Sequence, residues 1–402
     1  MTNRLDRREF LAGAAGVLAV RPQNSEANPP VGRVTVAPCK SYGSELVPTL
    51  ERMFDQLGGL GRLVKGKTVA VKVNFIGNSW NRLDHHGVED TFWTHPRMIG
   101  ATAHLLGKAG ARRIRVVEGA RSSAEPLEEF MMSVNWRPED IRGAAANVGF
   151  ENTNLLGTGK RYSRLKVPFG GWVFPAYDLN PAYEDCDVFI SLAKLKEHNG
   201  TGVTLSMKNV YGITPATIYG DGAGIDEPSL RPIGGRGAVC HQGKRGPSKS
   251  APQELDPASP RTTGYRVPRI TVELCAARPV DVAIIDGIHT VTGGEVAPYY
   301  DRAYSPALRR RMFAVKPGVL IAGTNCVATD AVAMAVMGFD PMAGSDREPF
   351  QGVKSDSTLQ LGERAGLGIR DPGRNDVVGT PISQVMFDFV AVREKLGRQV
   401  ID

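Results

Sequence analysis

The sequence lacks the features that define several large classes of protein. It has no run of about 18 apolar residues, which excludes a polytopic membrane protein, and no internal repeat, which excludes collagen and coiled-coil architectures. Its five cysteines form no CxxC pair, so neither a disulfide framework nor a thiolate zinc site is indicated. Acidic residues are interspersed with basic ones, so the formal charge of +7 does not form the basic surface that nucleic acid requires. With 42% hydrophobic residues, the chain is an ordinary globular protein.

Common catalytic and nucleotide-binding motifs are missing as well. There is no Walker loop, no GxGxxG after the first predicted strand, no GxSxG and no HExxH. P-loop nucleotide binding, a standard dinucleotide site and the α/β-hydrolase class are therefore not supported. The chemistry has to be inferred from where polar residues lie relative to the predicted strands.

The N-terminal segment, residues 1–27, has the composition of an export signal. Arg7 and Arg8 are followed by Phe10 and Leu11, which open a short, weakly apolar run, and Ser-Glu-Ala closes the segment as a small-x-small cleavage site. This pattern resembles a twin-arginine signal, so we expect recognition by the twin-arginine (Tat) export machinery and a periplasmic or extracytoplasmic location. The alternative is an amphipathic N-terminal helix.

Residues 28–402 are predicted to form a single large α/β domain. Apolar strands are expected at 67–76, 112–118, 187–193, 280–286 and 318–324, and a helix at 94–109 links the first two strands. The predicted fold is a mostly parallel sheet with helices on both faces, an antiparallel insert within 150–177, and an edge strand within 383–392. Residues 216–264 hold nine Gly and six Pro, which predicts a long irregular loop over the surface.

Polar residues follow each of the predicted strands. If the five strands are parallel, their carboxyl ends lie at one edge of the sheet, where α/β proteins bind ligands. The residues that would then converge are Asn74, Glu118, Lys194, His198, Asp286 and Asn325. The alternative is that strands have to end, and that polar residues commonly end them.

The segment after the third strand predicts an anion-binding site. In an extended chain Lys194, Lys196 and His198 share one face, and three cationic groups repel one another unless an anion lies between them. Residues 201–209 follow with hydroxyls, a glycine and backbone amides near a helix start, and they include Lys208 and Asn209. The bound species is expected to be a small anionic molecule, a carboxylate or a phosphate; the alternative is a solvated edge.

The residue types suggest a division of roles. Glu118, His198 and Asp286 are the candidate catalytic acids and bases. The candidate anion-binding residues are Asn74, Lys194, Lys196, Lys208, Asn209 and Asn325. His85, His86 and His95 could ligate a divalent metal, although two unconnected imidazoles in a polar loop explain the first pair equally well.

Several of these segments resemble the DUF362 domain family, a prokaryotic family of unknown function. The strongest match is SLAKLKEH at 191–198 running into TGVTLSMKNVYG at 201–212; VKVN at 71–74, THP at 94–96, DG at 286–287 and ATDAVA at 328–333 complete it. The resemblance implies a fold type and candidate site residues but no reaction. Members often carry ferredoxin-type cysteine clusters, which this chain lacks, so an iron–sulfur cluster is not expected.

Three functions fit these observations. The first is an exported enzyme, a metal-assisted isomerase, epimerase or hydrolase, that acts on a small anion by acid–base chemistry. The second is a periplasmic protein that binds a small molecule or cofactor without turnover. The third is an interaction protein whose basic loop, residues 231–249, docks on a partner.

Overall fold

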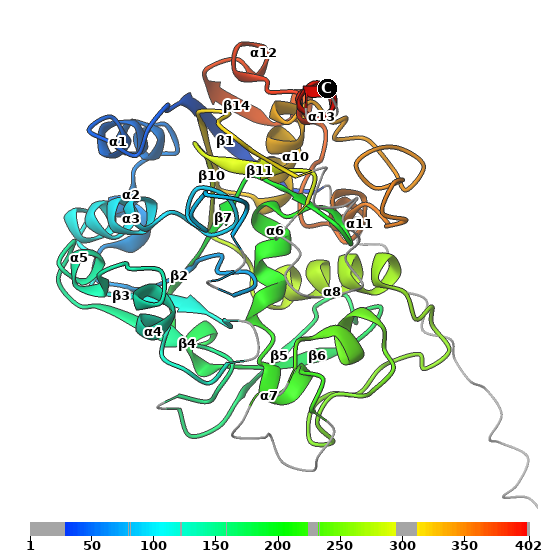
Figure 1. Cartoon of the computed structure of the whole chain (residues 1–402). Helices are drawn as coiled ribbons and strands as arrows, with labels where there is room; N and C mark the ends of the chain where they lie inside the picture. The colour runs from blue at the N-terminus through cyan, green and yellow to red at the C-terminus, as the bar shows by residue number, and fades with distance from the viewer. Residues whose placement is uncertain are drawn as a thin grey trace, which may run out of the picture.

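The computed structural model describes residues 29–78, 80, 82–120, 123–157, 159–223, 232, 234–294 and 312–399. The predicted signal at 1–27 lies outside these residues. The centre of the molecule is an eight-stranded sheet in the order β14-β1-β13-β10-β7-β2-β3-β4 (Figure 1). Its strands are β1 (Arg33–Pro38), β2 (Thr68–Lys72), β3 (Arg113–Glu118), β4 (Val148–Asn152), β7 (Val188–Lys194), β10 (Val282–Gly287), β13 (Val319–Gly323) and β14 (Asp376–Gly379).

The directions of the strands confirm a mostly parallel sheet and correct one expectation. Strands β4, β3, β2, β7 and β10 run parallel to one another. Strand β13 is antiparallel to both β10 and β1, so the expectation that all five apolar strands run in one direction is wrong. A strand that is buried on both faces reads as a continuous apolar run in either direction, so composition does not reveal its orientation.

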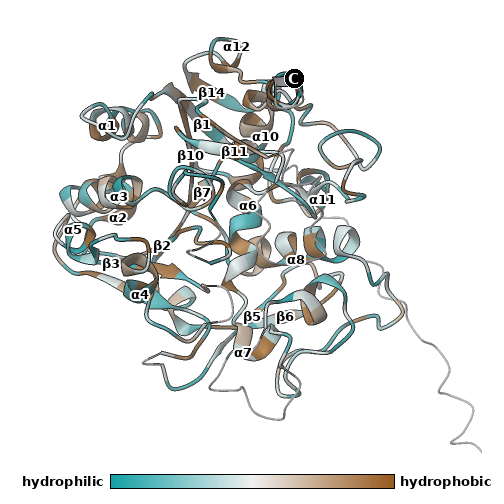
Figure 2. Cartoon of the chain, in the orientation of Figure 1, coloured by the Kyte–Doolittle hydropathy of each residue, from teal (hydrophilic) through white to brown (hydrophobic). Residues whose placement is uncertain are grey.

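Helices cover both faces of the sheet, as predicted. Along β7, Ile190 and Leu192 belong to the core under α1 and α3, whereas Phe189 and Ala193 belong to the core under α6, α8 and α10. Figure 2 shows hydrophobic residues along the central strands, which is the pattern expected of a sheet buried on both faces. The helices are α1 (Leu46–Gln56), α2 (Leu60–Val64), α3 (Pro96–Lys108), α4 (Leu127–Met132), α5 (Pro138–Arg142), α6 (Leu205–Val210), α7 (Ala216–Tyr219), α8 (Thr263–Ala277), α10 (Cys326–Val336), α11 (Thr358–Arg364), α12 (Ile382–Val385) and α13 (Phe389–Gln399).

Small antiparallel sheets accompany the main one. They are β5 (Ser163–Lys166) with β6 (Ala176–Leu179), β8 (Glu197–His198) with β9 (Gly202–Val203), and β11 (Thr290–Thr292) with β12 (Phe313–Val315). The first of them confirms an antiparallel insert. The edge strand expected within 383–392 is wrong: that stretch forms α12 and the start of α13, and the edge is β14, which pairs in parallel with β1.

The Gly/Pro-rich stretch is irregular but does not merely cover the surface. Its described residues contain α7 and a single π-helical turn, Gly237–His241, and add no strand to the sheet. Val239 and Cys240 in that turn are fully buried and belong to the same hydrophobic core as α8. Within the described part of the chain, no helix is both long and apolar enough to cross a bilayer.

Candidate functional site

A cavity of about 190 Å³ opens beyond the carboxyl ends of β2, β3 and β7. It is the place where open α/β sheets bind their ligands. The structure brings six sequence-predicted residues together there: Asn74, Glu118, Lys196, His198, Lys208 and Asn209. The rest of the lining is Lys72, Phe75, Ile76, Gly77, Gly119, Thr204, Tyr211, Gly212, Gly235, Arg236 and His241.

A buried ion pair forms one wall of the cavity. Lys72 Nζ lies 2.7 Å from Glu118 Oε1, and the two side chains are only 2% and 6% exposed. The same ammonium donates to Val73 O at 2.7 Å and to Asn209 Oδ1 at 3.3 Å, so its three hydrogens all have acceptors. Burial lowers the pKa of Lys72, and the neighbouring Glu118 carboxylate opposes that shift. Lys72 therefore holds Glu118 in place and has no hydrogen left to donate to a ligand.

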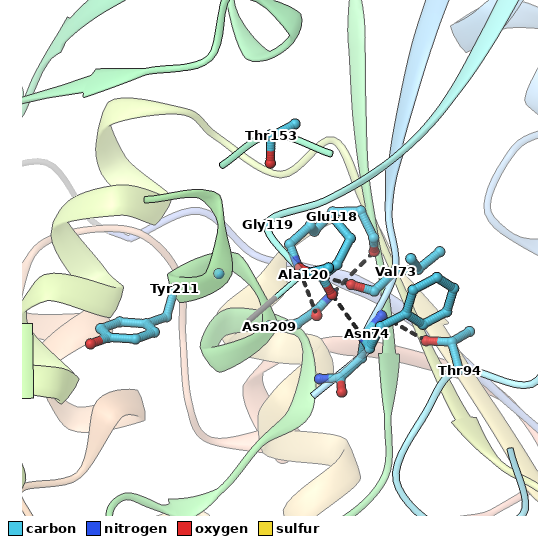
Figure 3. Close-up of polar contacts among 12 residues, drawn as sticks. Val73, Asn74, Thr94, Glu118, Gly119, Ala120, Thr153, Asn209 and Tyr211 are labelled. Atoms are coloured by element: carbon cyan, nitrogen blue, oxygen red, sulfur yellow. Dashed lines mark hydrogen bonds and ion pairs between the residues drawn. The ribbon is translucent and has the colours of Figure 1, made fainter. Parts of the chain in front are cut away.

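Glu118 is fixed from its other side by the backbone. Phe75 N donates to Glu118 Oε2 at 2.8 Å, which joins the end of β3 to the loop that follows β2. Asn74 N in the same loop donates to Thr94 Oγ1 at 2.9 Å (Figure 3). The carboxylate is thus an immobile acceptor, and each of its oxygens keeps a further lone pair for a ligand.

Arg236 closes the cavity from the irregular stretch. Its guanidinium donates to the carbonyl oxygens of Thr214, Gly119 and Gly212 at 2.7–3.2 Å. A Cβ at Gly119 would stand 2.5 Å from Gly212 O and 2.6 Å from Arg236 Nη2, so only glycine allows this approach. No pattern in the sequence predicts Arg236 as a site residue, because an irregular segment has no periodicity that shows where it will pack.

Helix α6 carries Lys208 and Asn209 into the lining. Asn209 Nδ2 donates to Lys72 O and to Ser191 Oγ at 3.1 and 3.0 Å. The Lys208 ammonium lies over the ring of Tyr211, 4.2 Å from its centroid, which is a cation–π arrangement. Both residues are thus held toward the cavity from one short helix.

The start of α6 is capped from a distant helix. Asp330 of α10 accepts hydrogen bonds from Ser206 N and Oγ and from Met207 N. Leu205 adopts a left-handed conformation, with φ at 46°, so the turn before the helix is strained and relies on such a cap. Burial raises the pKa of Asp330 to about 7, against the opposing effect of those hydrogen bonds.

His198 has a defined tautomer when it is neutral. Gly200 N donates to His198 Nδ1 at 2.9 Å, so the hydrogen of the neutral ring is on Nε2. The ring is buried at the edge of the cavity. In that tautomer Nδ1 is an acceptor and Nε2 is a donor.

Lys194 and Asp286 do not join the cavity. They pair directly across β7 and β10, with Lys194 Nζ 3.0 Å from Asp286 Oδ2, and both side chains are fully buried. The Tyr42 hydroxyl donates to Asp286 at 2.8 Å, and Lys194 also donates to Glu89 O. The expectation that Lys194 shares a face with Lys196 and His198 is wrong, because β7 ends at Lys194 and the strand alternation does not continue beyond it.

Asn325 lies at the opposite edge of the sheet. Because β13 is antiparallel to β10, the residue after its carboxyl end is far from the cavity rim. Asn325 caps α10 by accepting a hydrogen bond from Ala328 N, and it donates to Leu367 O. The expectation that Asn325 converges with the other strand ends is therefore wrong.

The three histidines proposed as metal ligands are not arranged as one group. His85 and His86 have ring centroids 4.2 Å apart. His95 instead caps α3 and stacks on Tyr42, with centroids 3.6 Å apart, and burial together with Lys194 lowers its pKa to about 2. Among the described residues, no set of three or more His, Cys, Asp or Glu side chains is placed to hold a metal ion.

The fold and this cavity define an α/β protein with a small, largely cationic site at the carboxyl edge of its parallel strands. A family model described as "domain of unknown function (DUF362)" matches residues 69–335, so the chain belongs to the DUF362 family, which confirms the resemblance. It is also similar to the thylakoid-associated protein sll1697 of Synechocystis sp., with 25% identity over 196 residues. That alignment covers 47% of this chain and 52% of the relative, so the match spans about half of each. No solved structure matches.

Proposed function

We propose that this protein binds a small anionic molecule, a carboxylate or a phosphate, in the cavity and acts on it by acid–base chemistry. The observation that carries the proposal is the charge of the lining: among the described residues that line the cavity, Lys72, Lys196, Lys208 and Arg236 are basic and Glu118 is the one carboxylate. Cationic side chains around a partly closed cavity favour an anion, because charge-assisted hydrogen bonds strengthen where water is excluded.

The lining residues divide into those that would bind the anion and those that would transfer a proton. Lys196, Lys208 and Arg236 would hold the anionic group. Glu118, fixed between Lys72 and Phe75 N, would accept a proton or a hydrogen bond, and His198 would donate through Nε2. An acceptor and a donor on either side of a bound carboxylate suit proton transfer next to it.

A second candidate is binding without turnover. It is favoured by the Lys72–Glu118 pair, because each carboxylate oxygen already accepts one hydrogen bond from the protein, from Lys72 Nζ or from Phe75 N. A carboxylate that the protein positions in this way can accept a hydrogen bond from a ligand without taking its proton. Incubating the protein with a carboxylate in deuterated water separates the two candidates. Exchange of the α-hydrogen of the carboxylate for deuterium indicates turnover, and no exchange indicates binding alone.

The anion site is tested by titrating inorganic phosphate and acetate calorimetrically into the protein and into Lys208→Met. Loss of one charge-assisted hydrogen bond should weaken binding by about 1.5–3 kcal/mol, or roughly 10- to 150-fold. Lys166→Met, which removes an exposed lysine of β5, is the matched control and should bind like the parent protein. Equal affinity of the Lys208 and Lys166 variants, or no binding of either anion by the parent, would overturn the proposal.

We further propose that the chain is exported by the twin-arginine route. The support is the pattern at residues 1–27, where Arg7 and Arg8 precede a short apolar run. Placed outside the cytoplasm, the cavity would meet periplasmic solutes.

A further inference from the structure

The Asn74 side chain has an unmet requirement for hydrogen bonds. It is 7% exposed and lines the cavity, yet its Oδ1 is buried without a partner, and its amide makes no hydrogen bond with any described residue. Its backbone is well held, because Asn74 N donates to Thr94. In Figure 3 the amide extends away from the Glu118 carboxylate, so the two groups do not satisfy one another.

A buried amide oxygen without a donor is unfavourable in a folded protein. In the orientation that the amide has in the structure, the buried atom is the acceptor Oδ1, which only a hydrogen-bond donor can satisfy. A bare carboxylate or a fully ionised phosphate can only accept, and it leaves the amide oxygen unsatisfied. A ligand that both donates and accepts would satisfy it.

The neighbouring ion pair adds to this selectivity. Because Lys72 has all three hydrogens engaged, the Lys72–Glu118 pair offers a ligand only the remaining lone pairs of the carboxylate. The Asn74 amide oxygen and the Glu118 carboxylate are therefore acceptors in a cavity whose other charged groups, Lys196, Lys208 and Arg236, are donors. The lining therefore has both hydrogen-bond acceptors and donors, and a complementary ligand has both as well.

We propose that the ligand carries a hydroxyl or amino group next to its anionic group, as in a hydroxy acid, an amino acid or a polyol phosphate. This rests on the proposed function, which supplies the anionic group held by Lys196, Lys208 and Arg236. The hydroxyl or amino group donates to Asn74 and Glu118, while the anion accepts from the Asn74 amide and the cations. A cavity of about 190 Å³ has room for a molecule of this class.

Two matched pairs of probes test the inference, one for each kind of anion. Lactate is compared with propionate, and glycerol 3-phosphate with propyl phosphate, by calorimetric titration into the full chain. The hydroxylated member of at least one pair should bind about tenfold more tightly, the combined effect of two hydrogen bonds. Asn74→Leu should reduce this preference to about threefold, because only the hydrogen bond to Glu118 remains. It should also weaken the binding of both members of a pair, because the anion loses the Asn74 amide.

The outcomes separate this inference from the proposed function. If both members of each pair bind equally, the anion site stands and the proposal of a hydroxyl or amino group on the ligand is overturned. If none of the four probes binds at millimolar concentration, both are overturned. An unchanged preference in Asn74→Leu also overturns the role of the amide; Asn74→Ala repeats the test should the leucine side chain disturb the fold.

Discussion

At the scale of single residues, burial decides whether a charge recognises a ligand or supports the fold. Lys194 and Lys196 are two residues apart, yet Lys194 forms an ion pair with Asp286 in the core and Lys196 lines the cavity. A buried pair of this kind is surrounded by its own partners, here the Tyr42 hydroxyl and Glu89 O. Removing one member leaves the other as an unpaired buried charge.

Lys194→Met should therefore destabilise the protein without weakening anion binding. The expected loss is about 3–5 kcal/mol in the free energy of unfolding, measured by urea denaturation, because Asp286 loses its counter-ion. Lys208→Met is the opposite case and should change stability by only about 0.5 kcal/mol while it loses anion affinity. Weaker phosphate binding by a Lys194 variant of normal stability would place Lys194 in the anion site after all.

The sequence predicted site residues that follow strands, but it did not predict a site residue within a strand. Glu118, Lys196 and His198 could be placed at one edge because strand ends meet there. Lys72 lies within the apolar strand β2, where a lone lysine could equally point to solvent, and its pairing with Glu118 depends on the register of β2 with β3. Arg236 belongs to an irregular segment, in which no local sequence pattern predicts the residue that lines the cavity.

At the scale of elements, the position of α6 depends on α10. Helix α6 has only the residues Leu205–Val210, and its own N-cap residue, Thr204, makes no side-chain cap. Asp330 supplies the cap from α10, and the helix in turn presents Lys208 and Asn209 to the cavity. The segment at 201–212 was recognisable in the sequence, but its cap, more than a hundred residues away, was not.

Asp330 should make stability depend on pH. Its pKa is raised by burial from 3.8 to about 7, so the folded state binds a proton more tightly than the unfolded state. Stability from this group is present below pH 4 and is lost as the pH rises to about 7, by up to about 4 kcal/mol. The pKa of Glu273 in α8 is raised by burial from 4.5 to about 7 and acts in the same direction.

Urea denaturation between pH 4 and pH 8 measures this effect. Asp330→Asn cannot ionise, so its stability should fall less steeply over that range than the stability of the parent, with the Glu273 contribution remaining. The slope, and not the absolute stability, is the readout, because an amide cannot accept all three hydrogen bonds at the start of α6. Identical slopes in the two proteins would show that Asp330 does not titrate there.

At the scale of the whole molecule, the fold class could be predicted and the directions of its outer strands could not. The alternation of strand and helix between residues 67 and 118 gives a parallel pair with high specificity, because parallel strands need a crossover. Beyond β10 the sheet continues with β13, β1 and β14, whose order in the sheet is unrelated to their order in the sequence. Pairing of distant segments is a property of the packed core and leaves no local pattern.

The proposed export is tested through the segment at residues 1–27. Replacing Arg7 and Arg8 together by lysine should abolish export of a reporter fused after residue 27, because the route reads the arginine pair and not the charge alone. Cell fractionation of the fusion measures the result, with the unaltered segment as control. Undiminished export of the lysine variant would contradict the twin-arginine assignment.

The pairing of β1 with β13 and β14 also sets the order in which the protein can fold. Gly32 N, just before β1, donates to Asn375 Oδ1, a contact that joins positions 343 residues apart. Until β13 has been synthesised, β1 has no partner and β10 has an open edge, which is the kind of surface that promotes aggregation. Such non-local contacts make folding slow, because a long loop must close before they form. The sheet is therefore completed only after nearly the whole chain has left the ribosome, and a transport route for folded protein would have to act after that moment.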